Sequence, residues 1–159
     1  MSDFHLLLEE EIPKLMRYAS ALTRDPDDAA ELIEDTVREA LDHEPALLGN
    51  PHVWLLTLLH DLRGNPFREM TRGAPVRHEP AALLTLSDLD RALGQLQEEQ
   101  RAVILLIGLE GLSYAHTAAV LRISVATLRS RLSHARATLR QLMGVEQAPR
   151  RVRGTARAA

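Results

Sequence analysis

Apolar residues recur through most of this chain at alternating spacings of three and four, the period of an α-helix. In the front half this pattern predicts a first helix over about residues 3–23. Pro13 lies inside it, so we expect a kink or a break there. A second helix is predicted to open at Asp25-Pro26, a polar cap followed by proline, and to end near His43.

A third helix is predicted to open in the same way at Asn50-Pro51 and to stop at Gly64. Glycines and prolines then interrupt any period as far as about residue 86, which predicts a linker. Further helices are expected from Ser87 and over about 97–109.

The segment from Leu109 to Leu142 predicts a helix-turn-helix. A break at residues 122–124 separates its two helices, and Ser124 is the expected N-cap of the second. The first helix takes its predicted apolar side from Leu112, Ala115, Ala119 and Leu121. The second carries one apolar stripe, made of Leu128, Leu132, Ala135, Leu139 and Leu142.

The rest of that second helix carries hydroxyls, a histidine and arginines, with no acidic residue. Such a surface fits a DNA major groove, where guanidinium groups meet phosphates or guanine edges. The plainer interpretation is a solvated basic helix packed on its own core. The short preceding helix, the tight turn and the absence of acids favour DNA binding.

Composition supports an all-helical protein and narrows its chemistry. The 159 residues are 45% hydrophobic but only 3% aromatic, which favours helices over strands, in one compact domain or two small ones. With no cysteine, disulfides and thiolate zinc sites are excluded. Apolar runs are too short to span a membrane, and the N-terminus lacks the basic segment of a secretory signal. A cytoplasmic protein without a membrane partner is expected.

Charge is unevenly distributed along the chain. Residues 1–72 hold 15 acidic and 7 basic side chains, whereas residues 73–159 hold 7 acidic and 12 basic ones. This asymmetry predicts two modules with different partners, of which the basic one faces nucleic acid.

Signals for catalysis are weak. The seven histidines show no paired spacing with an adjacent acid, as a helical zinc site would. The acids at 25, 27 and 28 lack the glycine and terminal glutamate of a calcium loop, and no phosphate-cradling glycine loop occurs. We therefore expect no enzyme activity, no metal, no cofactor and no small-molecule substrate.

Two stretches resemble one known family. The back half reads LGQLQEEQRAVILLIGLEGLSYAHTAAVLRISVATLRSRLSHARATLRQLM, which resembles domain 4 of the extracytoplasmic-function (ECF) sigma factors of bacterial RNA polymerase. The front half reads ALTRDPDDAAELIEDTVREAL and PHVWLLTLLHDL, which resemble helices of domain 2. The resemblance implies an all-α protein with two small helical domains joined by a flexible linker. The implied boundaries are a domain 2-like unit at 1–66, a linker at 67–86, a helix-turn-helix domain at 87–144 and a basic disordered tail at 145–159.

The resemblance also implies a mechanism and its partners. Such a protein directs transcription initiation through core RNA polymerase and promoter DNA, and an anti-sigma factor is a further expected partner. Domain 2 would dock on the polymerase clamp and capture the −10 element, and domain 4 would read the −35 element. The residues implied for polymerase binding are Glu31, Leu32, Glu34, Asp35 and Thr36. Those implied for DNA binding are Thr127, Arg129, Ser130, Arg131, His134 and Arg136, the last on phosphate.

The chain also departs from the family pattern. Asp61 stands where the family has an asparagine, few arginines follow the helix of Trp54, and Arg122 replaces a glycine in the turn. A positive φ at Arg122 would be strained. The low basic content after Trp54 favours an alternative, a sigma-like mimic that sequesters an anti-sigma factor without directing transcription. The arginines of the last helix disfavour it. A second alternative is a plain helix-turn-helix regulator that uses the back half alone. This interpretation leaves the acidic front half unexplained.

Overall fold

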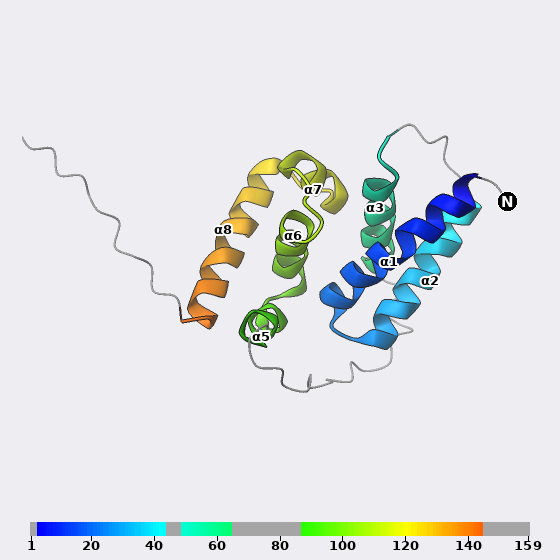
Figure 1. Cartoon of the computed structure of the whole chain (residues 1–159). Helices are drawn as coiled ribbons and strands as arrows, with labels where there is room; N and C mark the ends of the chain where they lie inside the picture. Colours follow the sequence, from blue (N-terminus) through cyan, green and yellow to red (C-terminus); the bar gives the residue numbers. More distant parts are fainter. Residues whose placement is uncertain (1–2, 44–48, 65–86, 145–159) are drawn as a thin grey trace, which may run out of the picture.

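The structure is a computed structural model, and it describes residues 3–43, 49–64 and 87–144. These residues form helices and no strand, as predicted (Figure 1). The helices are α1 (Asp3–Thr23), α2 (Pro26–Asp42), α3 (Pro51–Arg63), α5 (Ser87–Gln95), α6 (Glu98–Gly108), α7 (Tyr114–Leu121) and α8 (Val125–Leu142). Within the described ranges, no helix has the length and apolar character needed to cross a membrane. The predicted tail at 145–159 and nearly all of the predicted linker lie outside these ranges.

In the front half, α1, α2 and α3 pack against one another. The predicted caps are confirmed, because Asp25 accepts hydrogen bonds from the backbone N–H groups at 27 and 28, and Asn50 from those at 52 and 53. Of the kink or break predicted at Pro13, the break is wrong, since α1 is one continuous helix. Pro13 is exposed, so water can bond the carbonyl that loses its helical partner. Trp54 is half-buried and packs near Phe4, with ring centroids 6.3 Å apart.

In the back half, α7 and α8 form the predicted helix-turn-helix, and both contact α6. On α8 the first three positions of the predicted stripe are buried, whereas Leu142 is 39% exposed. The predicted apolar side of α7 is partly wrong, because Ala115 and Ala119 are exposed. Ala118 and Val120 are buried instead. The reason is that α7 packs against α3 of the front half as well as against α6 and α8, so its buried side is shifted from the one expected for the helix-turn-helix alone.

Figure 1 shows the two halves side by side, and one apolar cluster contains buried residues of both. Helix α6 contacts α1, and α7 contacts α3. The back half contributes Ala102, Leu105, Leu106 and Val120 to a cluster that otherwise consists of buried residues from α1, α2 and α3. The halves therefore sit in a closed arrangement.

Candidate nucleic-acid interface and the contact between the halves

The turn between α7 and α8 fixes where the candidate recognition helix begins. Ser124 caps α8, its Oγ accepting the backbone N–H of Thr127 at 3.1 Å and donating to Thr127 Oγ1 at 2.9 Å. Arg122 ends α7 in the left-handed region, with φ 53° and ψ 43°. The predicted cap is confirmed. A residue with a Cβ in this region carries about 1 kcal/mol of strain relative to glycine.

The side of α8 away from the core presents most of the predicted DNA-binding residues to solvent. The exposed members are Thr127, Arg129, Ser130, His134 and Arg136. Arg129, Arg136 and Arg140 follow one another seven and four residues apart, which places them in a row on one flank of the helix. Arg131 lies on the other flank, where its guanidinium comes within 3.7 Å of Glu99 on α6. The sequence-predicted set is therefore one exposed surface, with Arg131 at its edge.

The residues implied for polymerase binding do not share one face of α2. Glu31 and Glu34 are exposed and Asp35 is partly exposed, but Leu32 and Thr36 are fully buried. Thr36 donates its hydroxyl to the carbonyl of Leu32 at 2.7 Å. These two side chains pack in the core, so the expectation that they face a partner is corrected. The acids of the exposed face are partly neutralised, because one arginine, Arg38, pairs with Glu34 at 2.7 Å and Asp35 at 3.1 Å.

A histidine on α3 joins the two halves through a pair of carboxylates. His52 Nδ1 lies 2.5 Å from Glu11 of α1, and Nε2 lies 2.6 Å from Glu110, which follows α6. The bond to Glu110, together with that to Glu11 and both negative charges, outweighs burial and raises the pKa of His52 above its usual 6.5. Burial opposes ionisation of Glu11, but its bonds to Lys14 and His52 still lower its pKa. With Arg17 3.7 Å from Glu110, the cluster is held by opposite charges.

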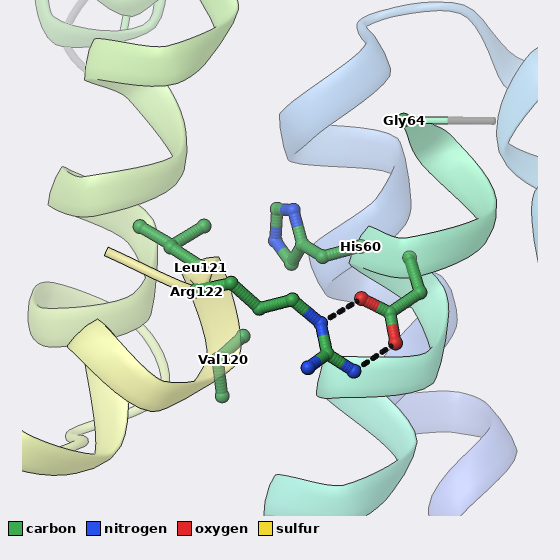
Figure 2. A pocket seen from close by; sticks show the side chains of 6 residues that line it. His60, Gly64, Val120, Leu121 and Arg122 are labelled. Atoms are coloured by element: carbon green, nitrogen blue, oxygen red, sulfur yellow. Dashed lines mark hydrogen bonds and ion pairs between the residues drawn. The ribbon is translucent and has the colours of Figure 1, made fainter. Parts of the chain in front are cut away.

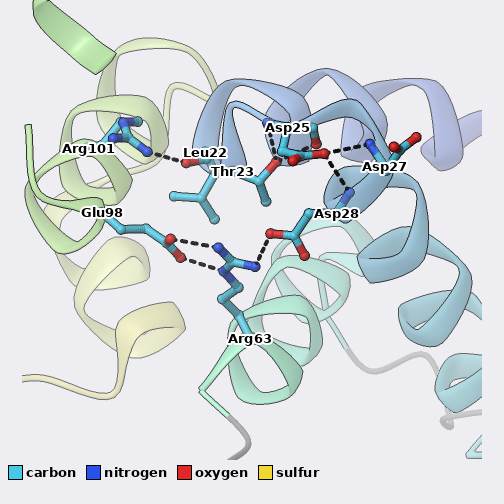
Figure 3. Close-up of polar contacts among 8 residues, drawn as sticks. All are labelled: Leu22, Thr23, Asp25, Asp27, Asp28, Arg63, Glu98 and Arg101. Carbon is cyan, nitrogen blue, oxygen red and sulfur yellow. Dashed lines mark hydrogen bonds and ion pairs between the residues drawn. The ribbon is translucent and has the colours of Figure 1, made fainter. Parts of the chain in front are cut away.

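Two arginines of the front half make forked contacts with carboxylates of the back half. Arg63 Nε and Nη2 donate to Glu98 at 2.5 and 2.7 Å, while Nη1 donates to Asp28 of its own half at 2.6 Å (Figure 3). Arg24 donates from both Nη atoms to Asp90 at 2.9 and 3.0 Å. This contact lowers the pKa of the Asp90 carboxyl.

Arg101 of α6 is buried and donates to backbone carbonyls of both halves. It bonds the carbonyls of Leu93 and Leu96 at 2.8 Å each, and also the carbonyl of Leu22 at the end of α1 (Figure 3). Leu22 and Leu93 lie in the last turns of α1 and α5, where carbonyls lack partners within the helix, and Leu96 directly follows α5. Burial, with Arg24 nearby, lowers the pKa of Arg101. A single side chain therefore ties α5 and α6 to α1.

Two of the departures from the family pattern are paired with each other. Arg122 Nε and Nη2 donate to the carboxylate of Asp61 at 2.6 and 2.7 Å (Figure 2). The pair borders an open pocket of about 300 Å³, lined by His60, Asp61, Gly64, Val120, Leu121 and Arg122. Burial lowers the pKa of His60 to about 4, and its Nε2 shares a hydrogen bond with the hydroxyl of Tyr18 at 2.7 Å. A neutral imidazole so held has a structural role.

Sequence reasoning missed the residues that hold the halves together. His52 and Glu110 are 58 positions apart, and Arg63 and Glu98 are 35 apart. No periodicity or motif connects such distant charges. The only available signal was the coincidence of an unexpected acid at Asp61 with an unexpected base at Arg122.

Known proteins are similar to this chain in the back half and over most of its length. The family model for sigma-70, region 4, matches residues 86–139. The ECF RNA polymerase sigma factor SigL of Mycobacterium tuberculosis is 34% identical over 152 residues, which cover 84% of this chain and 85% of SigL. The ECF RNA polymerase sigma factor EcfG of Rhodopseudomonas palustris is 29% identical over 150 residues, covering 86% of this chain and 83% of EcfG.

A solved structure is similar over nearly the whole chain. It is the sigma factor RpoE from Bartonella quintana, crystallised in complex with the anti-sigma factor NepR. The TM-score is 0.74 at 28% sequence identity, and the match covers 92% of this chain and all of RpoE. The likeness therefore extends over both halves, including the closed arrangement in which they are described here.

Proposed function

The chain belongs to the ECF sigma factors of RNA polymerase, and we propose that it binds core polymerase and directs initiation at promoters that both halves recognise. In this proposal it acts in the cytoplasm, residues 1–66 bind the polymerase and the −10 element, and residues 87–144 bind the −35 element. The observation that carries the proposal is the exposed surface of α8, which presents arginines and hydroxyls from a capped recognition helix.

The exposed residues of the predicted DNA-binding set divide between two proposed roles. Arg129 and Arg136 lie on the flank that faces a phosphate backbone when the helix enters the major groove, so they position the helix. Thr127, Ser130 and His134 lie farther from the core, where they reach base edges. Losing a base contact is expected to cost about 1–3 kcal/mol at one promoter position, whereas losing a phosphate contact weakens binding to all sequences.

For the polymerase, the proposed contact is the exposed acidic face of α2, formed by Glu31, Glu34 and Asp35. Carboxylates on one side of a helix pair with a basic surface and raise the rate and specificity of docking more than the affinity. An anti-sigma factor is a further proposed partner, supported by the RpoE structure, which was solved with one bound.

Gel filtration and promoter-specific transcription test the proposal together. The purified chain is expected to co-elute with core RNA polymerase at moderate salt, and the complex is expected to give a run-off transcript from a promoter selected with it. Arg129→Ala should reduce that transcript while still co-eluting. The matched control is Arg91→Ala, which removes an exposed arginine from α5. This variant should co-elute with core polymerase and give the wild-type amount of transcript. A chain that neither co-elutes nor supports transcription would contradict the proposal and favour the mimic.

A further inference from the structure

The front half is acidic overall, yet most of its lysines and arginines lie beside the back half, where Arg24 and Arg63 are largely covered and Arg17 is 58% exposed. Residues 3–64 contain five lysines and arginines, and three of them form ion pairs with carboxylates of the back half. The pairs are Arg17 with Glu110, Arg24 with Asp90 and Arg63 with Glu98. We call these three arginines the covered strip. The acidic α2 carries only Arg38, which is paired within its own helix.

The covered strip follows the length of α6. Glu98, which binds Arg63, opens this helix, and Glu110, which lies near Arg17, comes just after its end. Twelve residues of helix span about 18 Å. The strip is therefore about as long as five nucleotides of a DNA strand, at ~3.4 Å per step.

The proposed function requires that the back half leave this face. By their names the −10 and −35 elements lie about 25 base pairs apart, which is about 85 Å at ~3.4 Å per pair. In the closed arrangement the two halves share one apolar core, so they cannot reach both elements at once. The 22 residues at 65–86 can span at most about 75 Å when fully extended. The two halves, each with a radius of gyration of about 10 Å, cover the remaining ~10 Å. Separation of the halves is thus both necessary and possible by chain length.

Separation would leave Arg24 and Arg63 without the carboxylates of the back half that now bind them, and Arg17 without its 3.7 Å contact with Glu110. Arg63 would keep Asp28 on Nη1, but the Nε and Nη2 edge that binds Glu98 would become free. Arginine forks bind phosphate in the same two-pronged geometry in which they bind carboxylate. The carboxylates of Asp90 and Glu98, which these forks bind, therefore occupy sites that suit phosphate oxygens.

We propose that the covered strip of Arg17, Arg24 and Arg63 binds the phosphates of promoter DNA once the two halves have separated. The inference rests on the proposed function and extends it. It supplies the front half with the DNA-binding charge that its composition lacks. DNA is the partner because, in a promoter complex, the strip lies on the half that engages the −10 element, while the acidic face on α2 serves the polymerase.

The test measures how salt weakens promoter binding by the complete holoenzyme. Each lost phosphate contact reduces the slope of log affinity against log salt by about 0.7–0.9. Arg24→Gln combined with Arg63→Gln should therefore lower the slope by about 1.4–1.8, so that the affinity lost between 50 and 200 mM salt is smaller by about 7- to 12-fold. Each single variant should give half of the change in slope. Arg24→Lys with Arg63→Lys keeps the charge and should restore the wild-type slope.

Arg91→Gln removes one arginine outside the covered strip and should leave the slope unchanged. Equal slopes for the wild type and the double glutamine variant would overturn the inference. So would a double variant that loses core polymerase instead, because the strip would then bind a protein. If the wild-type chain forms no promoter complex at all, the proposed function fails. If it forms one and the slopes are equal, only the inference fails.

Discussion

Replacing His52 tests whether the closed arrangement depends on a protonated histidine. Both of its ring nitrogens face carboxylates, at 2.5 and 2.6 Å, and only an imidazolium can donate to both. A hydrogen bond to a charged group contributes about 1.5–3 kcal/mol, and glutamine can keep one of the two. His52→Gln should therefore lower the free energy of unfolding by about 2–3 kcal/mol. For a chain of this length that corresponds to a fall in Tm of about 4–12 °C.

The stabilisation that His52 provides should decrease as the pH rises. The pKa of His52 is raised in the folded chain, so its contribution is fully present below about pH 6.5 and is lost as the pH rises through the folded pKa. Thermal unfolding followed by circular dichroism at pH 6 and pH 9 should show the wild type losing stability at the higher pH. His52→Gln should lose less, so the two curves converge.

The matched control is His43→Gln. His43 is exposed and pairs only with Glu39 of its own helix, 3.2 Å away, so its replacement should leave Tm nearly unchanged. The reasoning would be refuted if His52→Gln melted within a degree of the wild type at pH 6. It would also be refuted if the difference between the two proteins grew with increasing pH.

Three further substitutions test other parts of the structure. Arg101→Met should lower the free energy of unfolding by about 3 kcal/mol in urea titrations, because three backbone carbonyls lose their donor; a loss below 1 kcal/mol would contradict that role. Arg122→Gly should be more stable than Arg122→Ala by about 1 kcal/mol, since both lose the Asp61 pair but only glycine accepts φ 53° without strain; equal stability would argue against the left-handed turn. Ser124→Ala should cost about 1 kcal/mol and weaken promoter binding by fraying the start of α8, whereas unchanged melting would mean that the cap contributes nothing.

Local signals explain what could be predicted from the sequence. The starts of α2, α3 and α8 follow from a polar side chain that caps the first turn, with proline next in two cases, and such contacts span only two or three residues. The apolar period also placed Leu128 and Leu132 in the core and left the arginines of α8 outside. These features depend only on residues that are close together along the chain, so they can be predicted from the sequence.

One error came from not applying the helical period strictly. Leu32 and Thr36 are four residues apart and belong to the apolar side of α2, so they could not face a partner together with Glu31. A second error, on α7, had a different cause, because the buried side of α7 also depends on its contact with α3, which the sequence does not reveal. The ion pairs between the halves were beyond prediction for a different reason. Many carboxylates could pair with Arg63, and only the folded chain selects Glu98.

The distance between the two halves provides the most direct test of the central claim, that a closed chain opens to direct transcription. The chain has no cysteine, so Ala30→Cys on α2 and Gln141→Cys on α8, both at exposed positions, accept fluorescent labels specifically. In the free chain the labels should lie within about 40 Å, the diameter of a compact chain of this length. In a promoter complex with core polymerase they should move apart to on the order of 80 Å. An unchanged distance in a complex that makes transcript would contradict the account.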